Sequence, residues 1–206
     1  MRLGIMGGTF DPIHLGHTLI AQGAQAEAGL DHILFVPAGI PWLKAGRAIS
    51  DGRHRLDMVR RAIGGSPFFG ASTLELDRPG PTYTVDTLEE LKCTMGQDTE
   101  LFVILGLDAL IQLPKWRQPQ RVLELCTLIG VTRPGHSGSL SFLDDIKPGA
   151  REAIIMMSSL QLDISGGEIR RRVARGLSIR HWVSDGVADY IWQEGLYTSP
   201  CHTDPR

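Results

Sequence analysis

Short apolar runs alternate with longer amphipathic runs along this sequence, and no other feature restricts its possible folds as strongly. The apolar runs are brief and bounded by Gly, Pro or polar residues, as strands buried in a sheet are. They lie at Leu3–Met6, His32–Val36, Phe68–Ser72, Leu101–Leu105, Thr127–Val131 and Ala153–Met157. The amphipathic runs predict helices at Leu15–Ala28, Arg53–Ile63, Val85–Met95, Gln118–Glu124, Gly166–Arg175 and Val187–Gln193. This alternation predicts an α/β fold, a Rossmann-like doubly wound parallel sheet with helices on both faces.

The length of the chain indicates one domain. Its 206 residues, 42% hydrophobic and 21% charged, suit a single core. We expect one domain over residues 1–198, followed by a polar tail over 199–206 that is predicted to be disordered. Two stretches rich in Gly and Pro, Pro37–Gly52 and Arg133–Gly149, are predicted to be loops.

Several classes of protein are disfavoured by composition. A formal net charge of −2 argues against a basic surface that coats nucleic acid. The three cysteines, Cys93, Cys126 and Cys201, form no CxxC pair, so neither a zinc framework nor a disulfide scaffold is predicted. The first apolar run is too short for a signal peptide, and no run reaches transmembrane length. We therefore expect a cytoplasmic protein that binds neither nucleic acid nor a membrane.

The segment Gly7–His17, GGTFDPIHLGH, follows directly on the first predicted strand and leads into the first helix. Ligands of open parallel sheets bind at such carboxyl ends, and a glycine turn lets the backbone approach an anion closely. The segment is neither a Walker loop nor a G-x-G-x-x-G fingerprint, because both patterns are absent. His14 and His17 at i, i+3 would point the same way and donate to a charge-rich transition state. A plain tight turn, or a metal site lacking an apparent third ligand, would also fit these residues singly.

A second segment, Ile164–Arg172, reads ISGGEIRRR. Ser165, with Glu168 three residues on, predicts a capping box at a helix start, where backbone N–H groups attract phosphate. Arg170 adds a forked donor. The alternative is a well-capped helix with a solvated basic face, which we prefer for Arg171 and Arg172.

Polar and aromatic residues in the middle of the chain are candidates for binding a second substrate. Tyr83 and Thr84 stand at the mouth of a predicted helix that Thr84 caps. Asp108 follows an apolar strand and so lies at a carboxyl end, unless it only caps the next helix. Trp116 offers an aromatic face for a flat heterocycle, although most tryptophans belong to the core.

The string GGTFDPIHLGH resembles, residue for residue, the signature of the nucleotidyltransferase superfamily with the (T/H)xGH motif, and within it the bacterial nicotinate-nucleotide adenylyltransferases. The resemblance spans nearly the whole chain and is weakest over 133–159. It implies that His14, His17 and Arg170 are catalytic. It implies ATP-binding residues at Gly7, Gly8, Thr9, Phe10, His14, His17, Lys44, Ser165 and Arg170. It implies mononucleotide-binding residues at Tyr83, Thr84, Asp108 and Trp116.

Two departures from the family pattern stand out. The family carries I-S-S/A-T-x-I-R where this chain has Gly166 and Gly167, so a threonine hydroxyl is missing. The family also has P-P-H-K where this chain has Pro41-Trp42-Leu43-Lys44, which keeps the lysine and loses the histidine.

The resemblance implies transfer of AMP from ATP to nicotinate mononucleotide, giving nicotinate adenine dinucleotide and pyrophosphate in NAD biosynthesis. Mg²⁺ is expected to be carried with ATP, because the sequence offers no dedicated carboxylate cage and no metal site of its own is predicted. Transfer to nicotinamide mononucleotide stays open, as does a non-catalytic nucleotide-binding regulator. A homo-oligomer is also left open, whereas phosphopantetheine as acceptor fits poorly with the Tyr83 and Trp116 segments.

Overall fold

The fold is built on a six-stranded sheet, seen in a computed structural model that describes residues 1–41, 49–132, 140–158 and 164–198. The strands are β1 (Arg2–Gly8), β2 (His32–Pro37), β4 (Phe69–Ala71), β6 (Glu100–Gly106), β7 (Cys126–Thr132) and β8 (Ile155–Ser158). Each contains the greater part of one predicted apolar run. The run Leu101–Leu105 is buried throughout, because a strand covered on both faces contacts no water.

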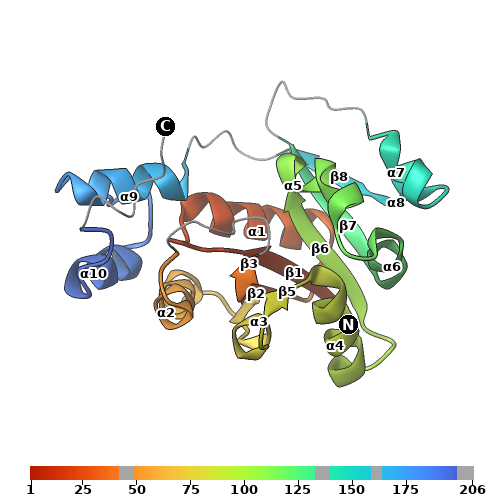
Figure 1. Cartoon of the computed structure of the whole chain (residues 1–206), viewed down its shortest axis with the longest axis horizontal. Helices are drawn as coiled ribbons and strands as arrows, with labels where there is room; N and C mark the ends of the chain where they lie inside the picture. The colour runs from red at the N-terminus through yellow and green to blue at the C-terminus, as the bar shows by residue number, and fades with distance from the viewer. Residues whose placement is uncertain (42–48, 133–139, 159–163, 199–206) are drawn as a thin grey trace. The chain divides into compact units, whose positions relative to one another are not determined.

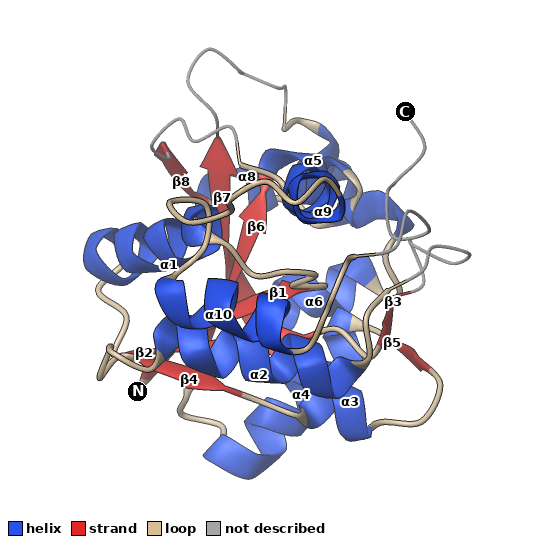
Figure 2. Cartoon of the chain, turned by 90° about the vertical axis from the view of Figure 1, so that its left-hand side faces the viewer, coloured by secondary structure: helices blue, strands red, loops and turns tan. Residues whose placement is uncertain are grey.

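Neighbouring strands follow the order β4-β2-β1-β6-β7-β8 (Figures 1 and 2). Counted along the chain, these six strands therefore read 3-2-1-4-5-6, the order of doubly wound nucleotide-binding sheets. β1 pairs in parallel with β6, β6 with β7, and β7 with β8. The predicted fold class is confirmed.

The chain divides by its internal packing into two units, one of Met1–Gly7, Ile20–Leu34 and Thr82–Gln161, the other of Gly8–Leu19, Phe35–Pro81 and Leu162–Arg206. We call them the first and the second unit. That they make one domain over residues 1–198 stays a prediction.

The first unit packs helices on β6 and β7. Its helices are α4 (Thr84–Met95), α5 (Leu107–Ile111), α6 (Pro119–Leu125), α7 (Phe142–Ile146) and α8 (Ala150–Ala153), with a 3-10 turn at Leu113–Lys115 and most of α1 (Leu15–Glu27). α6 lies against β7 and α4, and α7 lies beside α8 (Figure 1). The apolar stripe of α4, which includes Leu88 and Leu91, is buried.

The second unit contains α2 (Gly52–Ile63), α3 (Leu74–Asp77), α9 (Gly166–Ala174) and α10 (Asp185–Gln193). α2 begins where Asp51 Oδ1 accepts a hydrogen bond from the N–H of Arg53 at 2.8 Å. α10 packs against α2 (Figure 2), and α2 packs on β4. The short strand β3 (Ile40–Pro41) pairs with β5 (Pro81–Thr82) in a separate two-stranded sheet.

Local predictions needed four corrections. The stretch Pro37–Gly52 is not all loop, because β3 lies within it and pairs with β5. The stretch Arg133–Gly149 is not all loop, because α7 lies within it and buries Leu143. Ala153 ends α8 instead of starting a strand, so β8 begins at Ile155. Thr84 is the first helical residue of α4 and does not cap it; Tyr83, with extended backbone, precedes the helix. The predicted tail 199–206 lies outside the described residues.

None of the helices in the described ranges combines the length and the apolarity needed to span a bilayer.

Candidate functional site

The order of strands changes direction between β1 and β6. These two strands are parallel neighbours, so their carboxyl ends, at Gly7–Gly8 and at Gly106, lie at one edge of the sheet. Doubly wound sheets bind nucleotides at this switch point. The glycine loop predicted to bind ATP therefore starts where the fold places a ligand.

The two glycines of the loop serve different purposes. A Cβ at Gly8 would lie 2.8 Å from Cε1 of Phe10, whose ring folds back over the turn and is buried. A Cβ at Gly7 would meet no atom of the described residues within 4 Å. Gly8 is thus required by packing, whereas Gly7 borders open space. Phe10 itself has φ 50, a left-handed conformation that costs a residue with a Cβ about 1–3 kcal/mol.

His14 and His17 stack on each other. Their ring centroids are 3.7 Å apart at an interplanar angle of 30°, and the edge-to-face partner of His17 is Phe10 at 5.1 Å. The backbone N–H of His14 donates to Nδ1 of His17 at 3.2 Å. Because Nδ1 accepts, the neutral imidazole of His17 carries its proton on Nε2, which is then a donor.

His14 is held in its neutral form. Burial lowers its pKa from 6.5 to about 4. Its Nδ1 is enclosed and has no hydrogen-bond partner within the described part of the chain. At neutral pH the loop therefore presents an uncharged imidazole from His14.

The start of α9 lies against the glycine loop. Ser165 Oγ accepts from the N–H of Glu168 at 3.2 Å, so the predicted N-cap is present. Arg170 Nη1 donates to the carbonyl of Asp11 at 2.6 Å. A Cβ at Gly166 would lie 3.1 Å from the same carbonyl, so glycine there lets α9 approach closely. The structure thus holds Arg170 on the loop that carries His14 and His17, although Arg170 and its partner Asp11 are 159 residues apart in the sequence.

Sequence reasoning missed two buried polar residues that bind this loop from elsewhere in the chain, Arg55 and Tyr197. Arg55 falls in the predicted helix Arg53–Ile63 without being a candidate there, yet it is 3% exposed and donates to the carbonyls of Ser50 and Thr9. It lies four residues before Val59, on the buried stripe of an amphipathic helix, and a charge on such a stripe is the signal that should have singled it out. Tyr197 reaches Asp11 from the other end of the chain, and nothing local marks it.

The predicted mononucleotide residues lie in the first unit. Asp108 is exposed in the first turn of α5, directly after β6. Tyr83 and Trp116 are both half-buried, and the guanidinium of Arg117, the residue after Trp116, lies 4.9 Å from the centroid of the Tyr83 ring. Arg117 also pairs with Asp86 of α4 at 3.3 Å. The Tyr83 and Trp116 segments are therefore neighbours, and Arg117 is an addition to the candidate residues.

Lys44, a candidate ATP-binding residue, lies outside the described residues. Among the residues that are described, no group of three or more His, Cys, Asp or Glu side chains is arranged to hold a metal ion.

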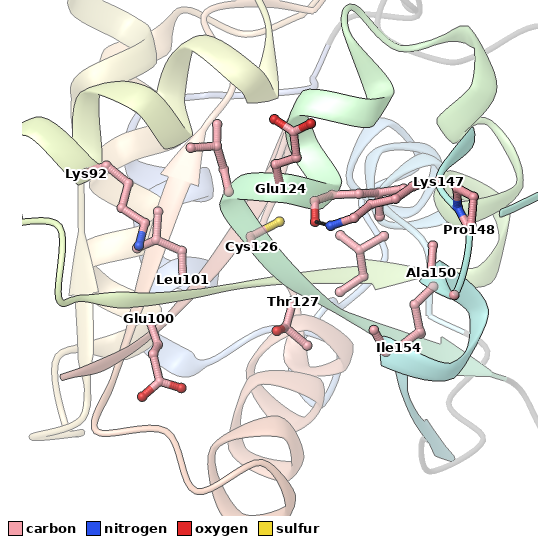
Figure 3. Close-up of a pocket in the computed structure, with 15 residues that line it drawn as sticks. Lys92, Glu100, Leu101, Glu124, Cys126, Thr127, Lys147, Pro148, Ala150 and Ile154 are labelled. Atoms are coloured by element: carbon pink, nitrogen blue, oxygen red, sulfur yellow. Dashed lines mark hydrogen bonds between the residues drawn. The ribbon is translucent and has the colours of Figure 1, made fainter. Parts of the chain in front are cut away.

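A cavity of about 360 Å³ in the first unit lies at the opposite ends of β6 and β7, near Glu100 and Cys126 (Figure 3). In its lining, Lys92 Nζ donates to the carbonyl of Thr99 at 2.7 Å and Lys147 Nζ to that of Leu123 at 3.1 Å. Burial raises the pKa of the Cys126 thiol to about 12, so this sulfur is not a nucleophile at neutral pH. The cavity is at the amino ends of the strands, away from the switch-point edge, and is not the candidate site.

Comparison with known proteins decides the family. The family model described as cytidylyltransferase-like matches residues 5–172. The chain belongs to the cytidylyltransferase-like family. A curated protein of Dehalococcoides mccartyi named "probable nicotinate-nucleotide adenylyltransferase" is 43% identical over 198 residues, covering 96% of this chain and 97% of its own length. A protein of the same name from Roseiflexus sp. is 44% identical over 195 residues, covering 95% and 97%. The predicted resemblance to these enzymes is confirmed.

A solved structure has the same fold. Plasmodium falciparum nicotinic acid mononucleotide adenylyltransferase, complexed with NaAD, superposes with a TM-score of 0.78 over 96% of this chain and 97% of that one. Its sequence identity is 20%, so this likeness shows the shared fold.

Gly16→Ala tests whether the His14 ring needs its present place. A Cβ at Gly16 would lie 3.0 Å from Nδ1 and 3.2 Å from Cε1 of His14, so the ring must move. We expect kcat/KM for adenylyl transfer to fall about tenfold or more, while the melting temperature holds or rises because Ala favours helix. Gly23→Ala in the same helix, where the added Cβ meets only the terminal methyl group of Met157, is the control. Unchanged kcat/KM in Gly16→Ala would show that the ring position is unimportant.

The neutral state of His14 makes stability depend on pH. Between pH 6.5 and about 4 the unfolded chain binds a proton at His14 and the folded chain does not, so the free energy of unfolding falls as pH drops. In His14→Asn the decrease in the free energy of unfolding between pH 7 and pH 4.5 should be smaller by up to about 3 kcal/mol. Urea unfolding at the two pH values measures it. His181→Asn, the same substitution at an exposed histidine, is the control. If the free energy of unfolding falls equally with pH in His14→Asn and in the wild type, burial does not keep His14 neutral.

Proposed function

We propose that this chain transfers the AMP part of ATP to nicotinate mononucleotide, forming nicotinate adenine dinucleotide and pyrophosphate. The observation that carries the proposal is the junction of the glycine loop with α9, which holds Arg170 on the loop of His14 and His17. The names of the curated relatives, at 43% and 44% identity over nearly the whole chain, support the choice of substrates.

The chemistry needs no protein nucleophile. An oxygen of the mononucleotide 5′-phosphate attacks the α-phosphorus of ATP, a new P–O bond forms, and the bond to the β-phosphate oxygen breaks. Pyrophosphate leaves with the electron pair. The protein has to hold the reactants in line and stabilise the charge that builds up on the phosphate oxygens.

The second unit supplies groups suited to those tasks. We assign His17 Nε2–H and His14 to the α- and β-phosphates, and Arg170 and Ser165 to the β- and γ-phosphates. An arriving phosphate counteracts the effect of burial and raises the pKa of His14. Gly7, Gly8, Thr9 and Phe10 would line the nucleotide, Lys44 is kept as a further phosphate ligand, and ATP is expected as its Mg²⁺ complex.

The acceptor is assigned to the first unit. Trp116 and Tyr83 offer aromatic faces to a pyridine ring, while Asp108 and Thr84 offer polar groups to the rest of the nucleotide. Nicotinate is preferred to nicotinamide because of the relatives' names. We also keep the expectation of a cytoplasmic enzyme as part of this proposal.

Pyrophosphate release from MgATP tests the proposal directly. Nicotinate mononucleotide, nicotinamide mononucleotide, flavin mononucleotide and phosphopantetheine are offered in turn, and we expect rapid release with nicotinate mononucleotide alone. His17→Ala should lower kcat about 10²- to 10³-fold, because it removes a donor to the transition state, whereas His181→Asn should not. Release with another acceptor would overturn the substrate, and ATP binding with no release would favour a regulator.

Gly7→Ala tests whether a phosphate approaches the loop backbone. The added Cβ meets no described protein atom within 4 Å, so the melting temperature should not change. If the triphosphate lies there, the KM for ATP rises about tenfold, since a methyl group occupies its space. Gly8→Ala, which clashes with Phe10, should instead lower the melting temperature. A Gly7→Ala variant with wild-type KM would place the nucleotide elsewhere.

A further inference from the structure

Asp11 belongs to the loop that carries the two histidines, and its carboxylate is buried in the second unit. Asp11 is 6% exposed. Its Oδ1 accepts from the hydroxyl of Tyr197 at 2.6 Å, and its Oδ2 accepts from the N–H of Ser50 at 3.3 Å. Both oxygens thus have donors, as a buried carboxylate requires.

Arg55 supplies the opposite charge to the same cluster. Its Nε donates to the carbonyl of Ser50 and its Nη1 to the carbonyl of Thr9, both at 2.9 Å. Burial lowers the pKa of Arg55, and the attraction of Asp11 is the largest of the effects that raise it. A guanidinium stays charged under such conditions. Arg55 therefore places a positive charge near the Asp11 carboxylate while its hydrogen bonds hold the backbone at Ser50 and Thr9.

Tyr197 joins the cluster from the C-terminal end of the second unit. It is 2% exposed and follows α10. Burial, with the charge of Asp11 as the next cause, raises the pKa of its hydroxyl well above the usual value. The hydroxyl therefore remains protonated and donates to Asp11 over the whole working pH range.

The cluster is connected to the groups that are assigned to ATP. Phe10, at φ 50, stands between Thr9, whose carbonyl Arg55 holds, and Asp11, whose carboxylate Tyr197 holds. The carbonyl of Asp11 in turn accepts from Arg170 at 2.6 Å. Bonds on both flanks of Phe10 thus determine its left-handed backbone and the place of the Arg170 guanidinium.

We propose that Tyr197 and Arg55 are positioning residues for the reaction. They fix Asp11 and Thr9, and through them they orient the histidine loop and Arg170 toward the phosphates. The inference rests on the proposed adenylyl transfer but adds residues outside the nucleotide-contacting set. It differs from a purely stabilising role, because catalysis should suffer more than folding does.

The first experiment compares two buried tyrosines in the full chain. Tyr197→Phe removes the donor to Asp11. Tyr190→Phe is the matched control, because its hydroxyl lies 2.9 Å from Nδ1 of His54 and donates to Asp57 at 3.3 Å, in the contact of α10 with α2. We expect kcat to fall about 10- to 100-fold in Tyr197→Phe and to stay at the wild-type value in Tyr190→Phe, with similar losses of melting temperature. Equal kcat in both variants would overturn the proposal.

A double-mutant cycle tests the route through Arg170. If Tyr197 acts by placing that guanidinium, Tyr197→Phe should cost only about twofold in an Arg170→Lys background. Independent effects that multiply would overturn this route.

A second pair of variants covers the case in which Tyr197→Phe does not fold. Arg55→Lys keeps the charge but cannot bridge the Ser50 and Thr9 carbonyls as a fork does. Arg61→Lys is its control on the same helix, where the guanidinium lies 4.6 Å from the Tyr190 ring centroid. A selective loss of kcat in Arg55→Lys supports the proposal, and a loss of stability alone overturns it. An inactive wild type would instead overturn the proposed function, so the two failures are distinguishable.

Discussion

The hydrogen bonds to Asp11 are the interaction on which the second unit depends. The carboxylate of this one residue binds Tyr197 and the backbone of Ser50, and its carbonyl binds Arg170. Removing a partner from a buried charge usually costs more than an intact pair contributes, because the remaining charge stays desolvated. A cluster of this kind leaves the loop few alternative conformations, which is what a site working by position requires.

Histidine chemistry in this loop follows from its packing. Burial keeps His14 neutral, and the bond from the His14 N–H to His17 Nδ1 selects the tautomer that donates from Nε2. Gly16 provides the space under the His14 ring. The free enzyme thus carries a neutral His14 ring stacked on the His17 ring, and the negative charge of an arriving phosphate favours the protonated form of His14.

Much of the fold was predictable from local patterns, and the exceptions have physical reasons. Bulky apolar runs such as Leu101–Leu105 form strands because their side chains are buried on both faces of the sheet. Ser165 caps α9 because a serine hydroxyl oxygen accepts a hydrogen bond from one of the first N–H groups of a helix, which have no partner within the helix. The helix α7 was missed because five residues carry little periodicity, and its stability comes from burying Leu143. Arg55 and Tyr197 were missed because their partners are distant in sequence.

The sequence by itself determined the class of the fold, the glycine loop, both histidines and the capped helix that carries Arg170, because each is written in a run of neighbouring residues. Tertiary structure alone decided which of these groups meet and in what state. The contact of Arg170 with Asp11, the low pKa of His14 and the burial of Tyr197 all arise from residues that approach only in the folded chain. Burial and desolvation are properties of the assembled surroundings, and no local pattern contains them.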